Sequence, residues 1–308
     1  MTENTLQQPA EPHRTRRAQV GILLALGGCV LFSIKPVLIK IAYQYGGDAT
    51  SIMALRAFSS LPLYLVMLFW LCRVPENRRN VQRHGLKAVA VGILGYYVAS
   101  YLDIASLAYI SAQLERLLLF LFPTFVVLIS WVFYRQRPSF HTLLAALVGY
   151  GGIMLIVIHD FHAFGDTVAT GSALAVSSAL IFAFYLVWSK PLIAQLGSSL
   201  FTSIGMGSAG AAILLHLWFS DVRITTLGPE LMIVGIVLGI FCTVIPSYLV
   251  AAAMARLTPT QLSLTSNIGP AITALSAVIV LGETFTLWHG LGMILVTVSV
   301  YLTNRSKS

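Results

Sequence analysis

The chain has 308 residues, of which 57% are hydrophobic and only 10% are charged, and its mean hydropathy is +0.84. This composition is far from that of a soluble globular protein and indicates an integral membrane protein. The formal net charge of +8 would suggest a nucleic-acid partner in a soluble protein, so the position of the charges along the chain decides what they mean.

Residues 1–18 form a polar segment with two prolines and three arginines, and we expect a disordered cytoplasmic tail there. Ten apolar stretches follow, each about 19 to 24 residues long and able to cross a hydrocarbon core roughly 30 Å thick as a helix. The expected spans are residues 20–43, 50–72, 86–109, 111–134, 140–158, 171–194, 199–219, 230–253, 258–281 and 285–303. Because no soluble domain fits between them, the sequence predicts an all-α membrane protein with ten transmembrane helices.

Basic residues gather in alternate loops. Counted from a cytoplasmic N-terminus, the loops on one side contain Arg14, Arg16, Arg17, Arg73, Arg78, Arg79, Arg83, Lys87, Arg135, Arg137, Lys190, Arg256, Arg305 and Lys307. The opposite loops are mainly acidic, with Arg223 as their basic residue. This asymmetry predicts that both termini are cytoplasmic in a bacterial-type inner membrane. The positive charge is then a topology signal, and we expect no nucleic-acid partner.

The sequence also contains an internal repeat. Residues 95–113 align with residues 242–260 at an offset of 147, and the same offset places Pro123 on Pro270. An offset of 150 relates the earlier helices of the two halves, and a longer loop after the second helix absorbs the difference. Internal copies of this kind are typical of membrane transporters.

Each copy has five expected helices, in residues 19–158 and residues 171–303. Because five is an odd number, the second copy must enter the membrane from the opposite side. Inverted repeats of this kind predict alternating access, with the substrate bound near the midplane between the halves.

Three stretches resemble a known family. They are "SIKPVLIKIAYQYGGDATSIMALRAF" in the first two helices, "ISAQLERLLLFLFPTFVVLISWVFYRQR" around the fourth, and "LTPTQLSLTSNIGPAITALSAVIVLGETFT" in the second half. Together with the five-plus-five layout, they resemble the EamA-type transporters of the drug/metabolite transporter superfamily. The resemblance implies export or exchange of a small metabolite, commonly an amino acid, through a central cavity. Tyr134, Arg135, Gln136 and Arg137 stand where many relatives have Gly-Glu-Arg, so a carboxylate is missing there.

Five ionisable residues lie inside the expected spans, where each costs roughly 2.5 to 3.5 kcal/mol on insertion scales. A rise of about 1.5 Å per residue places Lys35, Arg56, Asp103, Glu115 and Arg116 in one layer toward the outer surface. Their counterparts in the second copy are uncharged: Tyr185, Met206, Val250, Leu262 and Ser263. Three bases against two acids leave one positive charge in excess, which a substrate carboxylate would balance.

We expect Lys35 and Asp103 to bind substrate, and Arg56, Glu115 and Arg116 to form a gate or an ion-pair network. Adjacent helical residues point about 100° apart, so Glu115 and Arg116 cannot pair with each other. Alternatively, the whole set is a static ion-pair network, or Glu115 and Arg116 reach lipid headgroups.

Aromatic and proline residues complete the expected site. Tyrosine and tryptophan side chains near mid-depth, or nearer the inner side, are candidates to line the cavity, and packing or lipid contact is the alternative for each: Tyr97, Tyr101, Tyr185, Trp188 and Tyr248. Four prolines are expected to bend their helices: Pro36, Pro123, Pro246 and Pro270. Pro36 lies next to Lys35 and would leave a backbone carbonyl free beside it. Lys40 is shallower and is expected to snorkel to the outer interface.

The preferred function is a secondary transporter for a small carboxylate-bearing solute, with the bilayer and that solute as its partners and a monomer or homodimer as its assembly. Cationic drug efflux, a channel, a lipid flippase and an intramembrane enzyme are the alternatives. We expect no enzyme, because no HExxH or GxSxG motif is present, and no catalytic residue is assigned. The three cysteines lack CxxC spacing, and no nucleotide-binding motif is evident, so no metal and no cofactor are expected.

Overall fold

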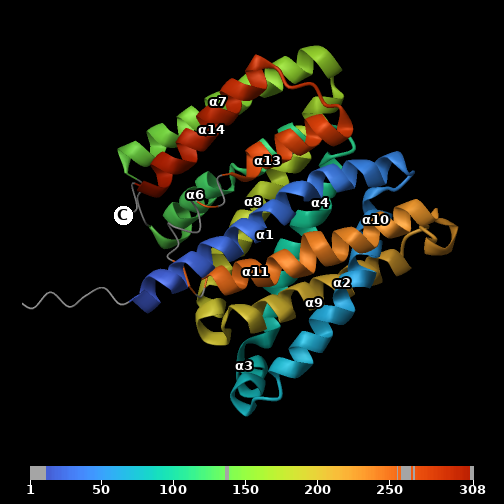
Figure 1. The fold of residues 1–308 in the computed structure, drawn as a ribbon, viewed down its shortest axis with the longest axis vertical. Coiled ribbons are helices and arrows are strands. Elements are labelled where there is room, and N and C mark those ends of the chain that lie inside the picture. Colours follow the sequence, from blue (N-terminus) through green and yellow to red (C-terminus); the bar gives the residue numbers. More distant parts are fainter. Residues whose placement is uncertain (1–11, 136–138, 255, 258–264, 266–267, 306–308) are drawn as a thin grey trace, which may run out of the picture.

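A computed structural model describes residues 12–135, 139–254, 256–257, 265 and 268–305. These residues form helices and their connections, with no strand among them. The elements are α1 (Pro12–Gln44), α2 (Ala49–Leu71), α3 (Pro75–Gly92), η1 (Ile93–Val98), α4 (Ala99–Ser106), α5 (Ala112–Leu119), α6 (Phe122–Tyr134), α7 (Phe140–Phe164), α8 (Thr167–Leu196), α9 (Ser198–Trp218), η2 (Ile224–Thr226), α10 (Pro229–Gly239), η3 (Ile240–Val244), α11 (Ile245–Met254), α13 (Gly269–Ser276), η4 (Ala277–Leu281) and α14 (Leu287–Arg305). Figure 1 shows them packed as one bundle.

Eight helical stretches of the described chain are long and apolar enough to cross a membrane, and two shorter apolar helices, 269–281 and 287–299, accompany them. The chain is therefore a multi-pass membrane protein. In Figure 1 the first turn of α1 and the last turn of α14 both lie toward the left of the bundle. Large apolar side chains remain exposed along the helices, as expected for surfaces that contact lipid.

Helix boundaries differ from the sequence-based expectation at two places. α1 begins at Pro12, so the part of the expected tail from residue 12 onward is helical, while residues 1–11 lie outside the described chain. The third stretch begins at Pro75 rather than at residue 86, because the polar residues before the apolar run continue the same helix as α3. Hydropathy marks where a helix can enter lipid and does not mark where the helix itself starts.

Two of the four prolines stand at helix starts and not at bends. The expected fourth span is interrupted after Leu119, and Pro123 lies in the first turn of α6. Pro270 lies in the first turn of α13, while residues 258–264 of the expected ninth span fall outside the described chain. At such positions the missing backbone N–H costs nothing, because the first turn of a helix has no acceptor for it.

The other two prolines lie within continuous helical stretches. Pro36 is inside α1, and Pro246 follows the π-helical segment η3 in the first turn of α11. Thr273 of α13 donates a 2.7 Å hydrogen bond to the carbonyl of Ser33, in the turn that Pro36 deprives of a donor. This bond ties α1 to a helix of the other half, one residue after Phe32, whose carbonyl loses its helical donor at Pro36.

Matching irregularities recur in the two halves. The π-helical segments η1 and η3 begin at residues 93 and 240, and α6 and α13 begin at residues 122 and 269, so both pairs are separated by 147 residues. Insertions of this kind inside helices are rare and are often found at functional sites. Their recurrence at the offset found in the sequence supports a duplicated architecture.

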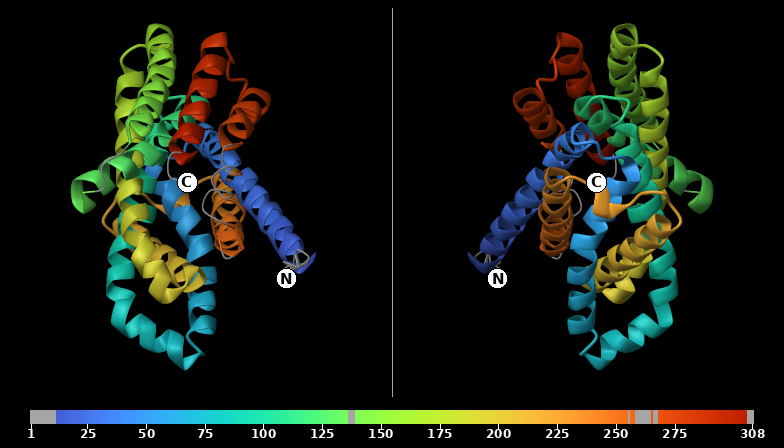
Figure 2. Two further views of the ribbon diagram at one scale, coloured as in Figure 1. Left: turned by 90° about the vertical axis from the view of Figure 1, so that its left-hand side faces the viewer. Right: turned by 90° about the vertical axis from the view of Figure 1, so that its right-hand side faces the viewer.

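The packing of the helices follows the same duplication. α2 packs against α9, and α7 packs along α14, each pairing one helix with its counterpart from the other half. α1 of the first half packs against α11 of the second half. The equivalent helices of the opposite halves, α8 and α4, also pack against each other. Figures 1 and 2 show α7 and α14 side by side at one end of the molecule and α1 beside α11 across its middle.

Candidate functional site

Lys35 and Asp103 form a buried ion pair between α1 and α4. Lys35 extends from α1, and its Nζ lies 2.7 Å from Oδ2 of Asp103 on α4. The two side chains are 15% and 4% exposed, so both charges are removed from water and each compensates the other. Asp103 therefore compensates the positive charge of Lys35, and Lys35 contributes little to the expected excess of positive charge.

Glu115 of α5 adds a second carboxyl to this pair. Its side chain is fully buried, and no donor among the described residues reaches either of its oxygens or Oδ1 of Asp103. The carboxyl groups of Glu115 and Asp103 are close enough for each to affect the charge of the other. Two carboxyls can share a hydrogen bond only if one of them carries a proton. The geometry therefore creates a place for one proton between α4 and α5.

Arg116 points across from α5 toward α1 and α13. Its Nη2 donates a long, 3.4 Å hydrogen bond to Oγ of Ser33, and its guanidinium lies 5.7 Å from the centre of the Phe120 ring. The same group rests against Gly269, where a Cβ would crowd it. Among the described residues no carboxylate lies within ion-pair distance of Arg116, and its Nε is unpartnered.

Arg56 of α2 is the most deeply buried arginine of the layer, with 7% of its surface exposed. Its Nη2 donates a 2.9 Å hydrogen bond to Oγ of Ser100, one turn before Asp103 on α4. Within the described chain no carboxylate comes within 4.0 Å of the guanidinium. Arg56 is thus a buried cation held by a neutral hydroxyl, which is an unusual and costly state in a membrane protein.

A small cavity of about 20 Å³ opens beside Arg56, which is room for about one water molecule. Residues of both halves enclose it, from α2, η1, α9 and η3. The lining residues are Arg56, Ala57, Ser60, Tyr64, Tyr96, Met206, Ala209, Gly210, Ile213 and Thr243. Met206 is the counterpart of Arg56 in the second copy, so the two equivalent positions face the same space.

Hydroxyl groups organise the wall of this cavity. The Tyr64 hydroxyl lies 2.9 Å from Oγ of Ser247 and 3.2 Å from the carbonyl oxygen of Thr243. The π-helical turn η3 exposes that carbonyl, since the Thr243 side chain bonds back to the carbonyl of Leu238 five residues earlier. The irregular turn therefore supplies a backbone acceptor at the interface between the halves.

Tyr185 and Tyr248, both expected in the site, lie around this cavity. The Tyr185 hydroxyl is 2.8 Å from that of Tyr96, and its ring lies directly over Gly95, where no side chain would fit. The Tyr248 hydroxyl is 2.7 Å from Oγ of Ser203. Its ring is 5.8 Å from that of Tyr64, so the two tyrosines support residues that line the cavity without lining it themselves.

The remaining expected aromatics lie elsewhere. Tyr97 bonds through its hydroxyl to Nδ1 of His216 at 3.0 Å, and the Tyr101 ring lies 5.4 Å from the same imidazole. Neither lines the cavity beside Arg56. Trp188 is 39% exposed and packs on Phe184, so the structure places it at the periphery of the bundle.

Lys40 does not snorkel as expected. Its Nζ donates hydrogen bonds to the carbonyls of Leu107 at 3.2 Å and Ile110 at 2.9 Å, at the C-terminal end of α4. Glu283 of the second half completes this connection by accepting bonds from the backbone N–H groups of Ala112 and Gln113 in the first turn of α5. A cation at a helix end and an anion at a helix start both follow the helix dipole, so these charges are structural.

Sequence reasoning missed Tyr64, Tyr96, Ser60 and Thr243. A charged residue inside a span indicates function because inserting it into the membrane costs much free energy. A tyrosine or threonine in an apolar stretch has no such cost and is usually interpreted as a packing residue. The available signal was that a buried hydroxyl must find a partner, which is expected to come from a neighbouring helix.

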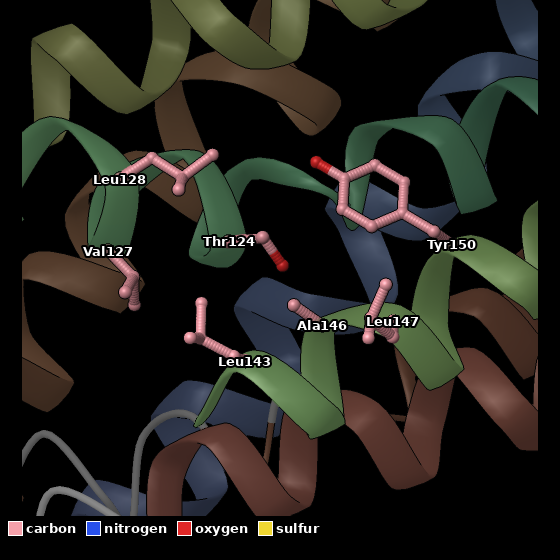
Figure 3. Close-up of a pocket in the computed structure, with 7 residues that line it drawn as sticks. All are labelled: Thr124, Val127, Leu128, Leu143, Ala146, Leu147 and Tyr150. Carbon is pink, nitrogen blue, oxygen red and sulfur yellow. The ribbon is translucent and has the colours of Figure 1, made fainter. Parts of the chain in front are cut away.

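A larger groove of about 320 Å³ lies between α6 and α7 and is almost entirely apolar. Figure 3 shows Leu143, Ala146 and Leu147 of α7 facing Val127 and Leu128 of α6 across it. Among the described residues no charged side chain lines this groove, and Leu147 is exposed on the outer surface of the bundle. It therefore does not supply the charged groups that the sequence places in the predicted site.

Comparison with known proteins supports a transport function. The model of the EamA-like transporter family matches residues 19–158 and again residues 169–305. The uncharacterized transporter YcbK of Bacillus subtilis (strain 168) is 27% identical over 288 residues, 92% of each chain. The uncharacterized inner membrane transporter YicL of Salmonella typhimurium is 26% identical over 227 residues, 74% of each chain. A solved crystal structure shares the fold, with a TM-score of 0.62 at 18% identity, covering 92% of this chain and 96% of the other.

Proposed function

Because the chain belongs to the EamA-like transporter family, we propose that it is a secondary transporter that exports or exchanges a small carboxylate-bearing solute, such as an amino acid, across the bacterial inner membrane. The observation that carries this proposal is the buried Arg56 guanidinium, which has a hydroxyl partner and faces a cavity between the two halves. A substrate carboxylate would supply the negative charge that Arg56 lacks.

The proposed mechanism is alternating access between two inverted five-helix halves, with ten crossings and both termini in the cytoplasm. The matching family domains, the 147-residue offset of the π-helical segments and the reciprocal contacts α1–α11 and α4–α8 support it. A two-fold axis in the membrane plane would pass between α2 and α9 and between α7 and α14, since each of these pairs joins equivalent helices.

The charges favour an anionic group over a cation. Lys35 occupies one oxygen of Asp103, and no donor among the described residues reaches the other carboxyl oxygen. Arg56 and Arg116 have no carboxylate partner among the described residues. An arginine guanidinium binds a carboxylate through two parallel hydrogen bonds, so either arginine offers a specific place for one. Cationic drug efflux would need an acid without competing cations, whereas Lys35, Arg56 and Arg116 outnumber the carboxyls of Asp103 and Glu115 in this layer.

The structure corresponds to a closed arrangement of the site. Ligand pockets typically enclose about 300 to 1,000 Å³, and the cavity beside Arg56 is far smaller. Substrate entry therefore requires the halves to separate on one side. The interface between α2 and α9 would open, and the π-helical turns η1 and η3 are the places where the helices can deform at low cost.

The carboxyl pair of Asp103 and Glu115 offers a means of energy coupling. When Asp103 and Glu115 share one proton, they carry one negative charge against the three positive charges of Lys35, Arg56 and Arg116, so the layer has a net charge of two. When the proton leaves, the net charge falls to one. A proton bound at the pair would therefore strengthen the attraction for an anion, and its departure would weaken it. We propose that the proton and the substrate carboxylate are carried together, so that the sum of their two gradients sets the direction of net transport. Export then occurs when the outward solute gradient is the larger of the two, and exchange needs no proton gradient.

Counterflow in proteoliposomes tests the proposed function. The purified protein is reconstituted with internal unlabelled solute and assayed against a panel of radiolabelled amino acids, organic acids and cationic drugs. We expect saturable counterflow for at least one carboxylate-bearing solute and none for the cations. Saturable transport of cations alone, flux that does not saturate, or lipid scrambling in place of solute exchange would contradict the proposal.

A further inference from the structure

A second cluster of polar side chains lies far from Arg56, where α7 ends and α14 begins. His159 and Asp160 are adjacent on α7, and His289 lies in the first turn of α14. A nitrogen from each imidazole and an oxygen from the carboxylate all lie within 4.8 Å of one another. Asp160 and His289 are only 2% and 4% exposed, so most of this cluster is enclosed.

Contacts around the cluster hold His289 in place. Its Nε2 is 3.3 Å from Oδ1 of Asp160, and its Nδ1 is 2.7 Å from Oγ1 of Thr286. The rings of His159 and His289 meet edge to face, with 5.7 Å between their centres. Asp160 is nearly fully buried, so its carboxylate needs a partner. Either a hydrogen on Nε2 of His289 or a bound cation can compensate its negative charge.

The two helices are also held tightly together. Gly152 of α7 and Gly292 of α14 approach each other so closely that neither position has space for a side chain, and Gly149 lies against Ser299 one turn further along. Figure 1 shows this helix pair at the edge of the bundle, away from α2 and α9. The cluster thus sits on a rigid support that is separate from the transport site.

From this geometry we propose that His159, Asp160 and His289 bind a transition-metal dication of the Zn²⁺ type. Two imidazoles and one carboxylate are a donor set that zinc uses, with a water molecule in the fourth position. Thr286 offers the outer contact that such sites need, because its hydroxyl lies 2.7 Å from Nδ1 of His289. In the tautomer that carries its hydrogen on Nδ1, this hydrogen is donated to the hydroxyl oxygen, and the Nε2 lone pair is free for the metal.

Metal binding requires a small contraction of the cluster. Tetrahedral coordination at roughly 2.0 to 2.2 Å per bond places neighbouring donor atoms roughly 3.4 Å apart. The half-exposed His159 side chain can supply the movement, because it is the less enclosed of the two imidazoles. The bound ion would join the last helix of each half at one end of the bundle.

The sequence offered no sign of this site. Our expectation of no metal depended on cysteine spacing, whereas the donors here are an adjacent His159 and Asp160 and a distant His289. The alternative to a metal site is a plain ion pair between His289 and Asp160, in which His159 takes no part. This difference makes His159 the informative residue for an experiment.

The test uses full-length protein purified in detergent, stripped with EDTA and dialysed against ZnCl₂. Bound metal is measured by mass spectrometry, and Co²⁺ substitution is followed by visible absorption. We expect one zinc ion per chain, Co²⁺ in its place when the stripped protein is given Co²⁺ alone, and no displacement of zinc by excess Mg²⁺, because nitrogen donors disfavour Mg²⁺. His159→Gln should weaken zinc binding at least about tenfold while leaving the His289–Asp160 contact and the fold intact.

Two further variants complete the design. His289→Gln should remove binding, and His84→Gln on α3, which is not part of a described cluster, should behave like the wild type. The proposal is overturned if the wild type binds no stoichiometric zinc at micromolar concentration. It is also overturned if His159→Gln binds zinc as tightly as the wild type, since the ion pair alone would then explain the cluster.

Discussion

Lys35 and Arg56 lie on neighbouring helices in the same layer, yet their surroundings differ. Lys35 meets the carboxylate of Asp103 at 2.7 Å, whereas Arg56 meets only the hydroxyl of Ser100 at 2.9 Å. Ser100 and Asp103 are one turn apart on a single stretch of helix, so one element serves both cations. The comparison teaches that the number of buried charges says little until it is known which of them are already compensated.

The largest effect expected from this comparison is on stability. Asp103→Asn leaves the buried Lys35 ammonium without a counter-charge, and losing one partner of a buried ion pair costs about 3 to 5 kcal/mol. We expect the variant to aggregate or to melt far below the wild type in a thermal-stability assay in detergent. The double variant Lys35→Met with Asp103→Leu should recover most of the lost stability, because neither charge then remains.

If Asp103→Asn melts at the same temperature as the wild type, the carboxylate of Asp103 does not compensate the charge of Lys35, and the comparison with Arg56 fails. If Lys35 only bound substrate, as the sequence led us to expect, Lys35→Ala would abolish transport and leave folding intact. The structure changes that expectation, because removing Lys35 strands the carboxylate of Asp103 beside Glu115.

The next effect concerns coupling. Glu115→Gln places a permanent donor where the shared proton would lie, so the fold should be retained. For the wild type, an inward proton gradient should accelerate uptake of the carboxylate solute, and for the variant the rate should be insensitive to the gradient while counterflow persists. Uptake driven by pH gradients of either sign is measured in proteoliposomes. Gradient-stimulated uptake by Glu115→Gln would show that the carboxyl pair does not carry the proton.

The smallest effect tests the wall of the cavity. Tyr64→Phe removes a hydroxyl that contacts Ser247 and the carbonyl of Thr243, and it should cost about 1 kcal/mol of stability and weaken transport. Tyr43→Phe is the matched control, since its hydroxyl bonds to the carbonyl of Ile104 and does not face the cavity. Similar melting temperatures for the two variants, with transport impaired only in Tyr64→Phe, are expected. Equal transport in both would place Tyr64 outside the site.

Much of the architecture could be read from the sequence, because hydropathy alone sets where helices can cross lipid. The family was recognisable for the same reason, since the spans, the repeat and motifs such as the stretch around Glu115 are local in sequence. The partners of the charges could not be read in this way. Whether Asp103 meets Lys35, Arg56 or Arg116 depends on how α1, α2, α4 and α5 are rotated, and a rise per residue gives depth without direction.

Some side chains also acquire roles that only packing creates. Trp188 and Tyr185 lie on the same helix at similar depth, yet one is peripheral and the other is wedged against Gly95. The cluster of His159, Asp160 and His289 likewise exists only because α7 and α14 pack along their length. Such sites depend on contacts between distant segments, for which a single sequence contains no direct record.

The central claim is that Arg56 receives the carboxylate of the substrate. The most direct test compares KM for a transported carboxylate solute and for its neutral amide analogue, in wild-type protein and in Arg56→Gln. Arg73→Gln, at an exposed position just after α2, is the control. The account predicts that the wild type and Arg73→Gln strongly prefer the carboxylate and that Arg56→Gln loses this preference. An unchanged preference in Arg56→Gln would contradict it.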